Sequence, residues 1–256
     1  MNQPSKFEWA LGLYDYLSAA PNPQTFARFF RIVSDFLGGL SIVPSHIAAE
    51  GEGYTGKLTK SGSAVTKRLV ESEFAHISAL SIVVSPNNSK EPAFDRLVSA
   101  SLTWTALSEL QMCLVANEAS AQFLGSQFDS VLKTLLEWRT WAFGFGLKDE
   151  ISRQPDFHIL TIDNGRLTNQ EREALTRWYR ARNEDRQVRL RDVYPVNVLN
   201  QKQTDRVIAG RTFGAIIESI PDSKVEEING VTLWKVPESK LAWISTDQSS
   251  PKLWAI

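Results

Sequence analysis

The residues that come nearest to a recognised chemical motif lie between Gly51 and Lys57. Their order, Gly51-Glu-Gly-Tyr-Thr-Gly56-Lys57, matches the first seven positions of a phosphate-binding P-loop. The eighth position should carry Ser or Thr to hold magnesium, and here it carries Leu58. A P-loop also follows a buried strand and opens a helix, and the flanking residues favour neither. The pattern therefore predicts a mobile surface loop over 48–62 rather than a nucleotide site.

A second candidate for chemistry is the arginine-rich segment 166–191, which holds eight arginines and no lysine. Arginines that follow phosphates, together with aromatic rings that stack on bases, are typical of nucleic-acid-binding surfaces. The segment offers Arg177, Arg180 and Arg182 for the first task and Trp178 and Tyr179 for the second. Acidic residues are interleaved with the arginines, and residues 165–256 carry 15 basic against 12 acidic side chains, a net charge of only +3. We therefore favour a solvated face with internal ion pairs, and both aromatic rings fall on the expected core side of the helix.

A third pattern has the letters of a metal-dependent nuclease: Pro221-Asp222, followed by Glu238-Ser-Lys240. That chemistry requires the Glu-x-Lys unit on a strand that faces the first Asp. Pro237 directly precedes Glu238 and would end such a strand, so we regard the match as fortuitous.

The remaining single residues predict no catalytic or metal site. Ser130 and Lys133 have the spacing of acyl-serine enzymes but lie inside an expected helix without the companion motifs. The three histidines and the single cysteine do not form a zinc pattern; they are His46, His76, His158 and Cys113. No cofactor is indicated, and the absence of strong catalytic motifs favours a binding protein over an enzyme.

Composition excludes several classes of protein. The chain has 256 residues, a net charge of −1 and 22% charged residues, which excludes a disordered acidic or basic chain. One cysteine cannot form an internal disulfide, so Cys113 is expected to be reduced and buried. The N-terminus lacks the basic start and apolar core of a signal peptide, and no apolar run is long enough for a membrane span. We expect a cytoplasmic protein.

Periodicity predicts the elements that must position these residues. Large apolar side chains alternate over 7–14, which indicates a half-buried strand. Helices are expected at 23–37, 126–140 and 168–182, the first with Asn22 as N-cap and Pro23 at its first position. Short helices are expected to begin at Asn200 and Thr212. The expected strands cover 40–43, 74–84, 97–104, 110–115, 225–228 and 231–236, the last two joined by Asn229-Gly230.

This order of elements favours an α+β fold, mainly an antiparallel sheet with helices packed on one face. Strand, helix and strand occur near 7–43 and again near 110–162, which would fit a pseudo-repeat. The stripe of Phe26, Phe29, Phe30 and Val33 should pack against the sheet that contains Trp9, Leu11 and Leu13. The change in charge and the turn at 163–165 suggest a boundary between an α+β domain at 1–164 and a helix-plus-hairpin region at 165–256, which could also pack as one domain.

The C-terminal half resembles the immunity proteins of bacterial polymorphic toxin and type VI secretion systems. The residues that carry this resemblance span about 140–237: Leu190-Arg-Asp-Val-Tyr194-Pro-Val-Asn197-Val-Leu199, Gly210-Arg-Thr and Asn229-Gly-Val-Thr-Leu-Trp234-Lys-Val-Pro237. The resemblance implies an α+β, cytoplasmic, non-enzymatic protein that binds a secreted toxin or effector, and no catalytic residues carry over from it.

Two functions follow as hypotheses. The first is an immunity protein that blocks a toxin's active site through the loop 48–62. In that loop, the anionic and aromatic group of Glu50, Glu52 and Tyr54 would mimic phosphate in a basic nuclease cleft. The second is a protein that binds or cuts nucleic acid through the arginine-rich segment.

Overall fold

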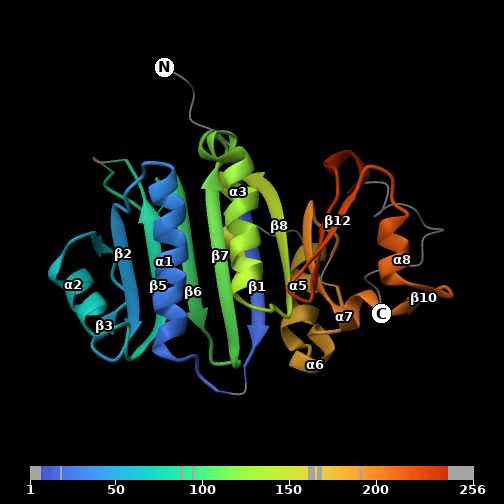
Figure 1. Ribbon diagram of the computed structural model, residues 1–256, viewed down its shortest axis with the longest axis horizontal. Coiled ribbons are helices and arrows are strands. Elements are labelled where there is room, and N and C mark those ends of the chain that lie inside the picture. Colours follow the sequence, from blue (N-terminus) through green and yellow to red (C-terminus); the bar gives the residue numbers. More distant parts are fainter. Residues whose placement is uncertain are drawn as a thin grey trace.

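The computed structural model describes residues 7–17, 19–86, 89–93, 95–160, 165, 169–190 and 192–241. Figure 1 shows a broad sheet with helices packed against it. The sheet has eleven strands in the order β12-β13-β9-β8-β1-β7-β6-β5-β2-β3, with β4 also paired to β2. Every pairing in it is antiparallel. The expected α+β class is therefore confirmed.

Residues 7–117 form the strands from the centre of the sheet to one of its ends: β1 (Phe7–Tyr16), β2 (His46–Gly51), β3 (Tyr54–Thr55), β4 (Thr59–Lys60), β5 (Ile77–Val84), β6 (Val98–Trp104) and β7 (Glu109–Asn117). Those that complete it are β8 (Phe143–Glu150), β9 (Val196–Asn200), β12 (Lys224–Ile228) and β13 (Val231–Lys235). A separate two-stranded sheet joins β10 (Val207–Ile208) to β11 (Arg211–Thr212).

Strand β1 lies at the centre of the sheet, between β7 and β8. Its side chains alternate between two apolar cores, as a strand covered on both faces requires. Leu11 and Leu13 point into the core beneath the two long helices, and Ala10 and Tyr14 point into a second core on the opposite face. The predicted alternation in 7–14 is confirmed, and β1 is buried on both faces rather than one.

Helix α1 (Pro23–Gly39) forms where the apolar stripe and its cap predict it. The Asn22 side chain accepts a hydrogen bond from the Thr25 amide at 3.1 Å, and Pro23 occupies the first turn, where its missing N–H costs nothing. Phe26, Phe29 and Val33 are buried in the same core as Leu11 and Leu13, so the predicted packing is confirmed. The partly buried Phe30 lies against the ring of Phe74, 5.2 Å between centroids.

The second long helix, α3 (Glu118–Trp138), lies beside α1 on the same face of the sheet (Figure 1). It begins eight residues before the expected start at Ser126, so the capping-box interpretation of that serine was wrong. Val131, Leu132, Leu135 and Leu136 form its buried stripe.

Helices cover both faces of the sheet, whereas the sequence predicted one. Helix α4 (Pro155–Ile159), preceded by a single 3-10 turn at Ile151–Arg153, contacts β1, β7 and β8. Ile159 of α4 and Trp178 of α5 (Asn169–Arg180) close the second core over Ala10 and Tyr14. These amphipathic segments are too short for periodicity to show which face of a sheet they cover.

The C-terminal strands carry a third core. Helices α7 (Gln201–Thr204) and α8 (Phe213–Glu218) begin as predicted at the caps Asn200 and Thr212. Phe213 meets the ring of Trp234 edge-on at 5.8 Å. The hairpin β12–β13 turns at Asn229 and Gly230, both with positive φ (48° and 79°), as its sequence predicts.

Two local predictions were wrong. No strand forms at 40–43, because Ser41 has φ 58° in the left-handed region and its amide continues the end of α1 by bonding to Gly38. Residues 48–62 are not an irregular loop: they complete β2 and form β3 and β4, and α2 (Ala64–Glu71) follows. The strand–helix–strand order does occur twice, as β1–α1–β2 and β7–α3–β8.

The division of the chain at residue 164 remains a prediction, although β8 and β9, from either side of that boundary, pair in one sheet. Within the described residues, none of the helices combines the length and apolarity that crossing a bilayer requires.

Candidate functional site

The candidate partner-binding residues lie on the hairpin formed by β2 and β3. Gly51 and Gly53 adopt positive φ (143° and 78°), which lets the chain reverse within a few residues. The amide of Glu52 donates to the carbonyl of His76 at 2.9 Å, and β2 pairs with β5 along its length. The hairpin is therefore tied to the sheet by backbone hydrogen bonds.

Tyr54 is fixed in place rather than projecting into solvent. Its ring is half-buried against the core beneath α1. The guanidinium of Arg68, on α2, lies 4.5 Å above the ring centroid and donates to the Gly53 carbonyl at 2.5 Å. The Tyr54 hydroxyl lies 3.4 Å from the Ser72 hydroxyl. A ring exposed on a surface loop was expected for Tyr54, and this expectation was wrong: Tyr54 is the anchor of the hairpin.

The two acidic side chains are exposed at this end of the molecule. Glu52 lies 3.4 Å from the His76 ring nitrogen, with both side chains mostly in solvent. Glu50 pairs with Thr55, the neighbour of Tyr54, so strand alternation places Glu50 on the face opposite the Tyr54 ring. The three predicted residues share one hairpin but not one surface.

The residues that match the P-loop sequence do not have the geometry of a phosphate-binding loop. Gly51 to Lys57 run through a β-hairpin, and the next helix, α2, begins at Ala64 with Ser63 as its N-cap. The glycine-rich turn and the helix N-terminus that a P-loop joins are separate here.

The predicted arginine face is partly present. Arg177 and Arg180 are exposed on α5, and Arg182 pairs with Asp185 at 3.4 Å. Trp178 is buried against Phe143, with ring centroids 5.3 Å apart, so it is not available to stack on a base. Tyr179 is 56% exposed, which corrects the expectation that it faces the core.

Arg186 has a structural role that its place among the other arginines of the sequence does not indicate. It is buried on α6 (Asn183–Arg186) and donates to the carbonyls of Trp178 and Tyr179 at 3.0 and 2.6 Å, at the end of α5. Its guanidinium lies 3.8 Å from the buried carboxylate of Glu109, which also accepts from Gln111 at 2.7 Å. This charged group attaches the arginine-rich segment to β7, so part of that segment serves the fold.

Burial raises the pKa of the nearby Tyr16 hydroxyl, and the negative charge of Glu109 adds to the effect. A second buried ion group connects Arg96 to Glu8 on β1 and to Asp156 on α4, at 3.0 and 2.9 Å. Together these two groups fasten the helices of the second face to the sheet.

Of the three residues that match the metal-dependent nuclease pattern, the fold brings two together. Lys240 lies 3.7 Å from Asp222, but Glu238 is exposed and opens a helical turn after Pro237 instead of lying on a strand. Within the described residues, no group of three His, Cys, Asp or Glu side chains is placed to hold a metal ion. Lys133 of the discarded Ser130 pattern donates to Glu226 at 2.7 Å.

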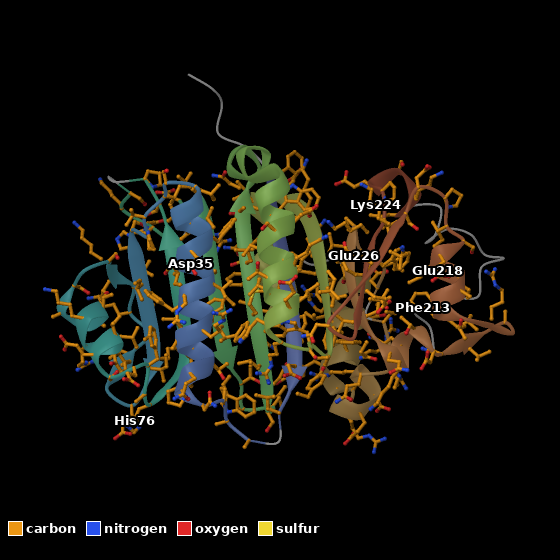
Figure 2. The ribbon with its side chains drawn as sticks, viewed as in Figure 1. Asp35, His76, Phe213, Glu218, Lys224 and Glu226 are labelled. Atoms are coloured by element: carbon orange, nitrogen blue, oxygen red, sulfur yellow. The ribbon has the colours of Figure 1, made fainter. Side chains whose placement is uncertain are left out.

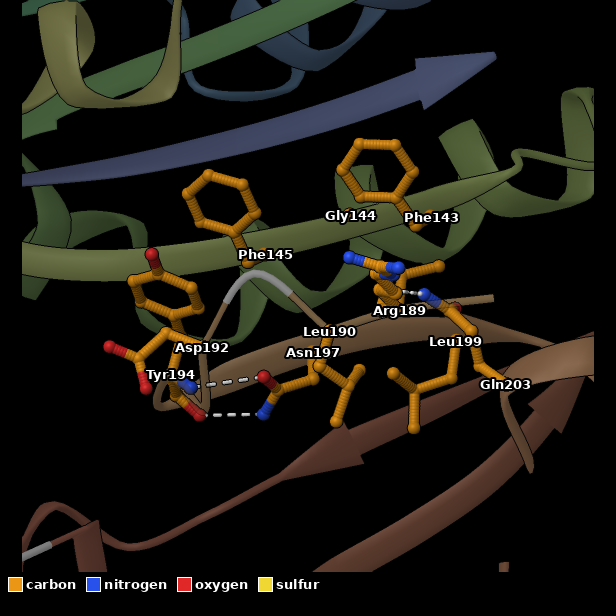
Figure 3. Close-up of a pocket in the computed structure, with 11 residues that line it drawn as sticks. Phe143, Gly144, Phe145, Arg189, Leu190, Asp192, Tyr194, Asn197, Leu199 and Gln203 are labelled. Atoms are coloured by element: carbon orange, nitrogen blue, oxygen red, sulfur yellow. Dashed lines mark hydrogen bonds between the residues drawn. The ribbon is translucent and has the colours of Figure 1, made fainter. Parts of the chain in front are cut away.

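The motif Tyr194-Pro-Val-Asn197, which carried part of the sequence resemblance, has a structural role. Asn197 is buried and exchanges hydrogen bonds with the backbone of Tyr194 at 3.0 and 2.6 Å, as Figure 3 shows. The Tyr194 ring stacks on Phe145 at 4.3 Å, and its hydroxyl lies 3.0 Å from His158. The cavity beside these residues has about 10 Å³, which is the space of roughly one water molecule.

Comparison with known proteins shows a shared fold at low sequence identity. No protein-family model matches the chain, and no curated protein matches it. Among solved structures, the T6SS protein PA0821 of Pseudomonas aeruginosa superposes with a TM-score of 0.61 at 8% identity, over 91% of this chain and 66% of that one. The two chains share a fold. This chain spans about two thirds of the length of PA0821.

A second solved structure is the toxic C-terminal tip of CdiA from Pseudomonas aeruginosa in complex with immune protein. It aligns with 57% of this chain and 89% of that one at 9% identity, with a TM-score of 0.29. That score is too low to carry an argument about fold or function.

Proposed function

We propose that this protein is a non-enzymatic immunity protein that neutralises a bacterial toxin by direct binding. The observation that carries the proposal is the braced acidic hairpin of β2 and β3, which presents Glu50 and Glu52 from a backbone that cannot easily rearrange. The fold shared with a T6SS protein supports the class of partner, a secreted toxin or effector.

The physical advantage of such a hairpin is pre-organisation. A rigid loop loses little conformational freedom when it binds, so more of its contact energy appears as affinity. Tyr54 and Arg68 supply this rigidity from beneath, while the carboxylates of Glu50 and Glu52 remain in solvent. The carboxylates of Glu52, at the turn, and of Glu50, two residues earlier on β2, could occupy phosphate positions of a basic nuclease cleft and accelerate association with it.

The experiment first requires a toxin or secretion effector whose gene lies next to the gene for this protein, and uses it as the binding partner. The toxin is expressed in a sensitive bacterium with and without this chain, and the dissociation constant of the purified pair is measured by titration calorimetry. We expect the wild-type chain to restore growth. We expect the double variant Glu50→Lys/Glu52→Lys to weaken binding by at least about 100-fold, since reversing charges in the centre of an interface typically costs several kcal/mol.

The matched control is Asp35→Lys/Glu137→Lys, which makes the same change in net charge at two exposed acids on α1 and α3. It should bind the toxin as the wild type does, and both variants should unfold at the wild-type urea concentration. If the hairpin variant and the control bind the toxin with equal affinity, the hairpin is not the toxin-binding surface.

The competing function is nucleic-acid binding through Arg177, Arg180 and Arg182. It predicts tight binding of duplex DNA by the chain alone, with a steep dependence on salt that disappears when the three arginines are replaced by Ala. That result, together with failure to protect against the toxin, would contradict the immunity proposal.

A further inference from the structure

In the part of the chain that the structure describes, the outer edge of β12 is unpaired. β12 is the last strand at its end of the main sheet, and no described strand pairs with its outer side. At the opposite end, the edge of β2 is covered by the two short strands β3 and β4. An open edge strand exposes backbone donors and acceptors that can pair with another chain.

The register of the hairpin identifies the open backbone groups. Ile228 and Val231 flank a two-residue turn, so they form a hydrogen-bonded pair, and such pairs alternate along an antiparallel ladder. Glu226 and Lys224 therefore bond inward to β13, while the N–H and C=O groups of Val225 and Glu227 point outward. In the described chain, neither of these two residues makes another backbone hydrogen bond.

The side chains of β12 distinguish between the ways in which two copies could pair. Lys224 and Glu226 lie on the same side of the strand, and Figure 2 shows both along β12. In a symmetric pairing centred on Val225, each Lys224 lies opposite Glu226 of the second copy, and this attraction occurs twice. A pairing centred on Glu226 or on Glu227 would instead place that carboxylate opposite its own copy.

The contacts of neighbouring residues are compatible with the pairing centred on Val225. Lys133 of α3 donates to Glu226 at 2.7 Å and holds its side chain in place. A carboxylate has acceptor capacity for a second cation, so Lys224 of the second copy can bind it as well. The other face of β12 is occupied, because Val225 packs in the core formed by α8 and Trp234.

We propose that two copies of this chain associate through β12, antiparallel and centred on Val225, so that the main sheet continues across the two-fold axis. This contact is isologous, because the same residues are used by both copies. A five-residue strand buries less than the roughly 1,200 Å² typical of stable complexes, so we expect a dissociation constant in the micromolar range. The association needs no toxin and is independent of the proposed function.

The first test is sedimentation velocity of the purified chain over a range of concentrations. Val225→Pro removes an outward N–H without breaking the bonds between β12 and β13, and proline is tolerated at such edge positions. It should weaken self-association at least about tenfold, since two backbone hydrogen bonds are lost across the axis. The control Val225→Thr retains both the N–H and the branched side chain and should behave as wild type.

The second test determines the register. Lys224→Glu and Glu226→Lys should each weaken association, and the double variant Lys224→Glu/Glu226→Lys should restore it. A mixture of Lys224→Cys and Glu226→Cys chains should form a disulfide between the two variants, and neither variant should cross-link with itself; Cys113 is buried and does not compete.

Cross-linking of the Glu226→Cys chain with itself would overturn the register. A wild-type chain that remains monomeric at the highest concentration would overturn the proposal, and so would an association that Val225→Pro does not weaken. Since all of these measurements use the chain alone, their failure leaves the toxin-binding experiment unaffected, and the reverse also holds.

Discussion

Replacing Arg186 by Met should destabilise the protein far more than replacing any exposed arginine of the same segment. The Arg186 side chain is only 5% exposed, and its removal breaks the ion pair with the Glu109 carboxylate, 3% exposed, in the core. It also removes two donors from the last carbonyls of α5. Breaking a buried ion pair from one side typically costs about 3–5 kcal/mol, a large part of a total stability of about 5–15 kcal/mol.

Urea unfolding measures this loss directly. With a slope of about 3 kcal/mol per molar urea, the midpoint of Arg186→Met should fall by about 1–2 M. The control Arg182→Ala should stay within about 0.5 kcal/mol of wild type, because the Arg182 side chain is 78% exposed. Adding Glu109→Gln to Arg186→Met also removes the buried negative charge that Arg186 faces, and should recover a large part of the loss. If Arg186→Met and Arg182→Ala unfold at the same urea concentration, Arg186 does not act as a buried tether.

Three further predictions concern single side chains. Tyr54→Ala should cost about 1–3 kcal/mol in urea unfolding and Glu52→Ala within about 0.5 kcal/mol, since only Tyr54 packs against the core; equal losses would contradict the anchoring role. Burial raises the pKa of Tyr16 above its ordinary value of 10.0, so the contribution of Tyr16 to the free energy of unfolding should be complete below pH 10 and should decline as the pH rises above 10. The Tyr16→Phe variant should lack this decline when its free energy of unfolding is measured against pH. Burial likewise raises the pKa of the Cys113 thiol, so a thiol reagent should leave the native chain unlabelled at pH 8 and label it in urea; rapid native labelling would show that the thiol is accessible.

Local patterns were sufficient for some elements. Helix α1 could be predicted from its apolar stripe, Asn22 and Pro23, because capping and amphipathicity are properties of adjacent residues. The hairpin at Asn229-Gly230 could be predicted for the same reason. Asn229 also donates to the Leu136 carbonyl at 3.0 Å, at the end of α3, a contact that no local pattern contains.

Other elements depend on residues far away in the chain. The sequence around Ala48 and Ala49 has weak strand propensity, and it forms β2 because β5, β3 and β4 pair with it. The same is true of the candidate site. Glu52 could be recognised as exposed and acidic, but the support of Tyr54 by Arg68 depends on the packing of α2 against the hairpin. The burial of Arg186 likewise depends on Glu109, on another element.

The central position of β1 affects how the chain can fold during its synthesis. β1 is complete at residue 16, yet its two neighbours are β7, which ends at residue 117, and β8, which ends at residue 150. At a translation rate of about 5–20 residues per second, β1 waits for roughly 7–27 s before both of its edges can be paired. Both edges of this apolar strand are open on the ribosome until β7 is complete, and the edge that faces β8 stays open until residue 150. Non-local pairing of this kind is intrinsically slow. We therefore expect the nascent chain, more than the finished protein, to depend on chaperones for protection against aggregation.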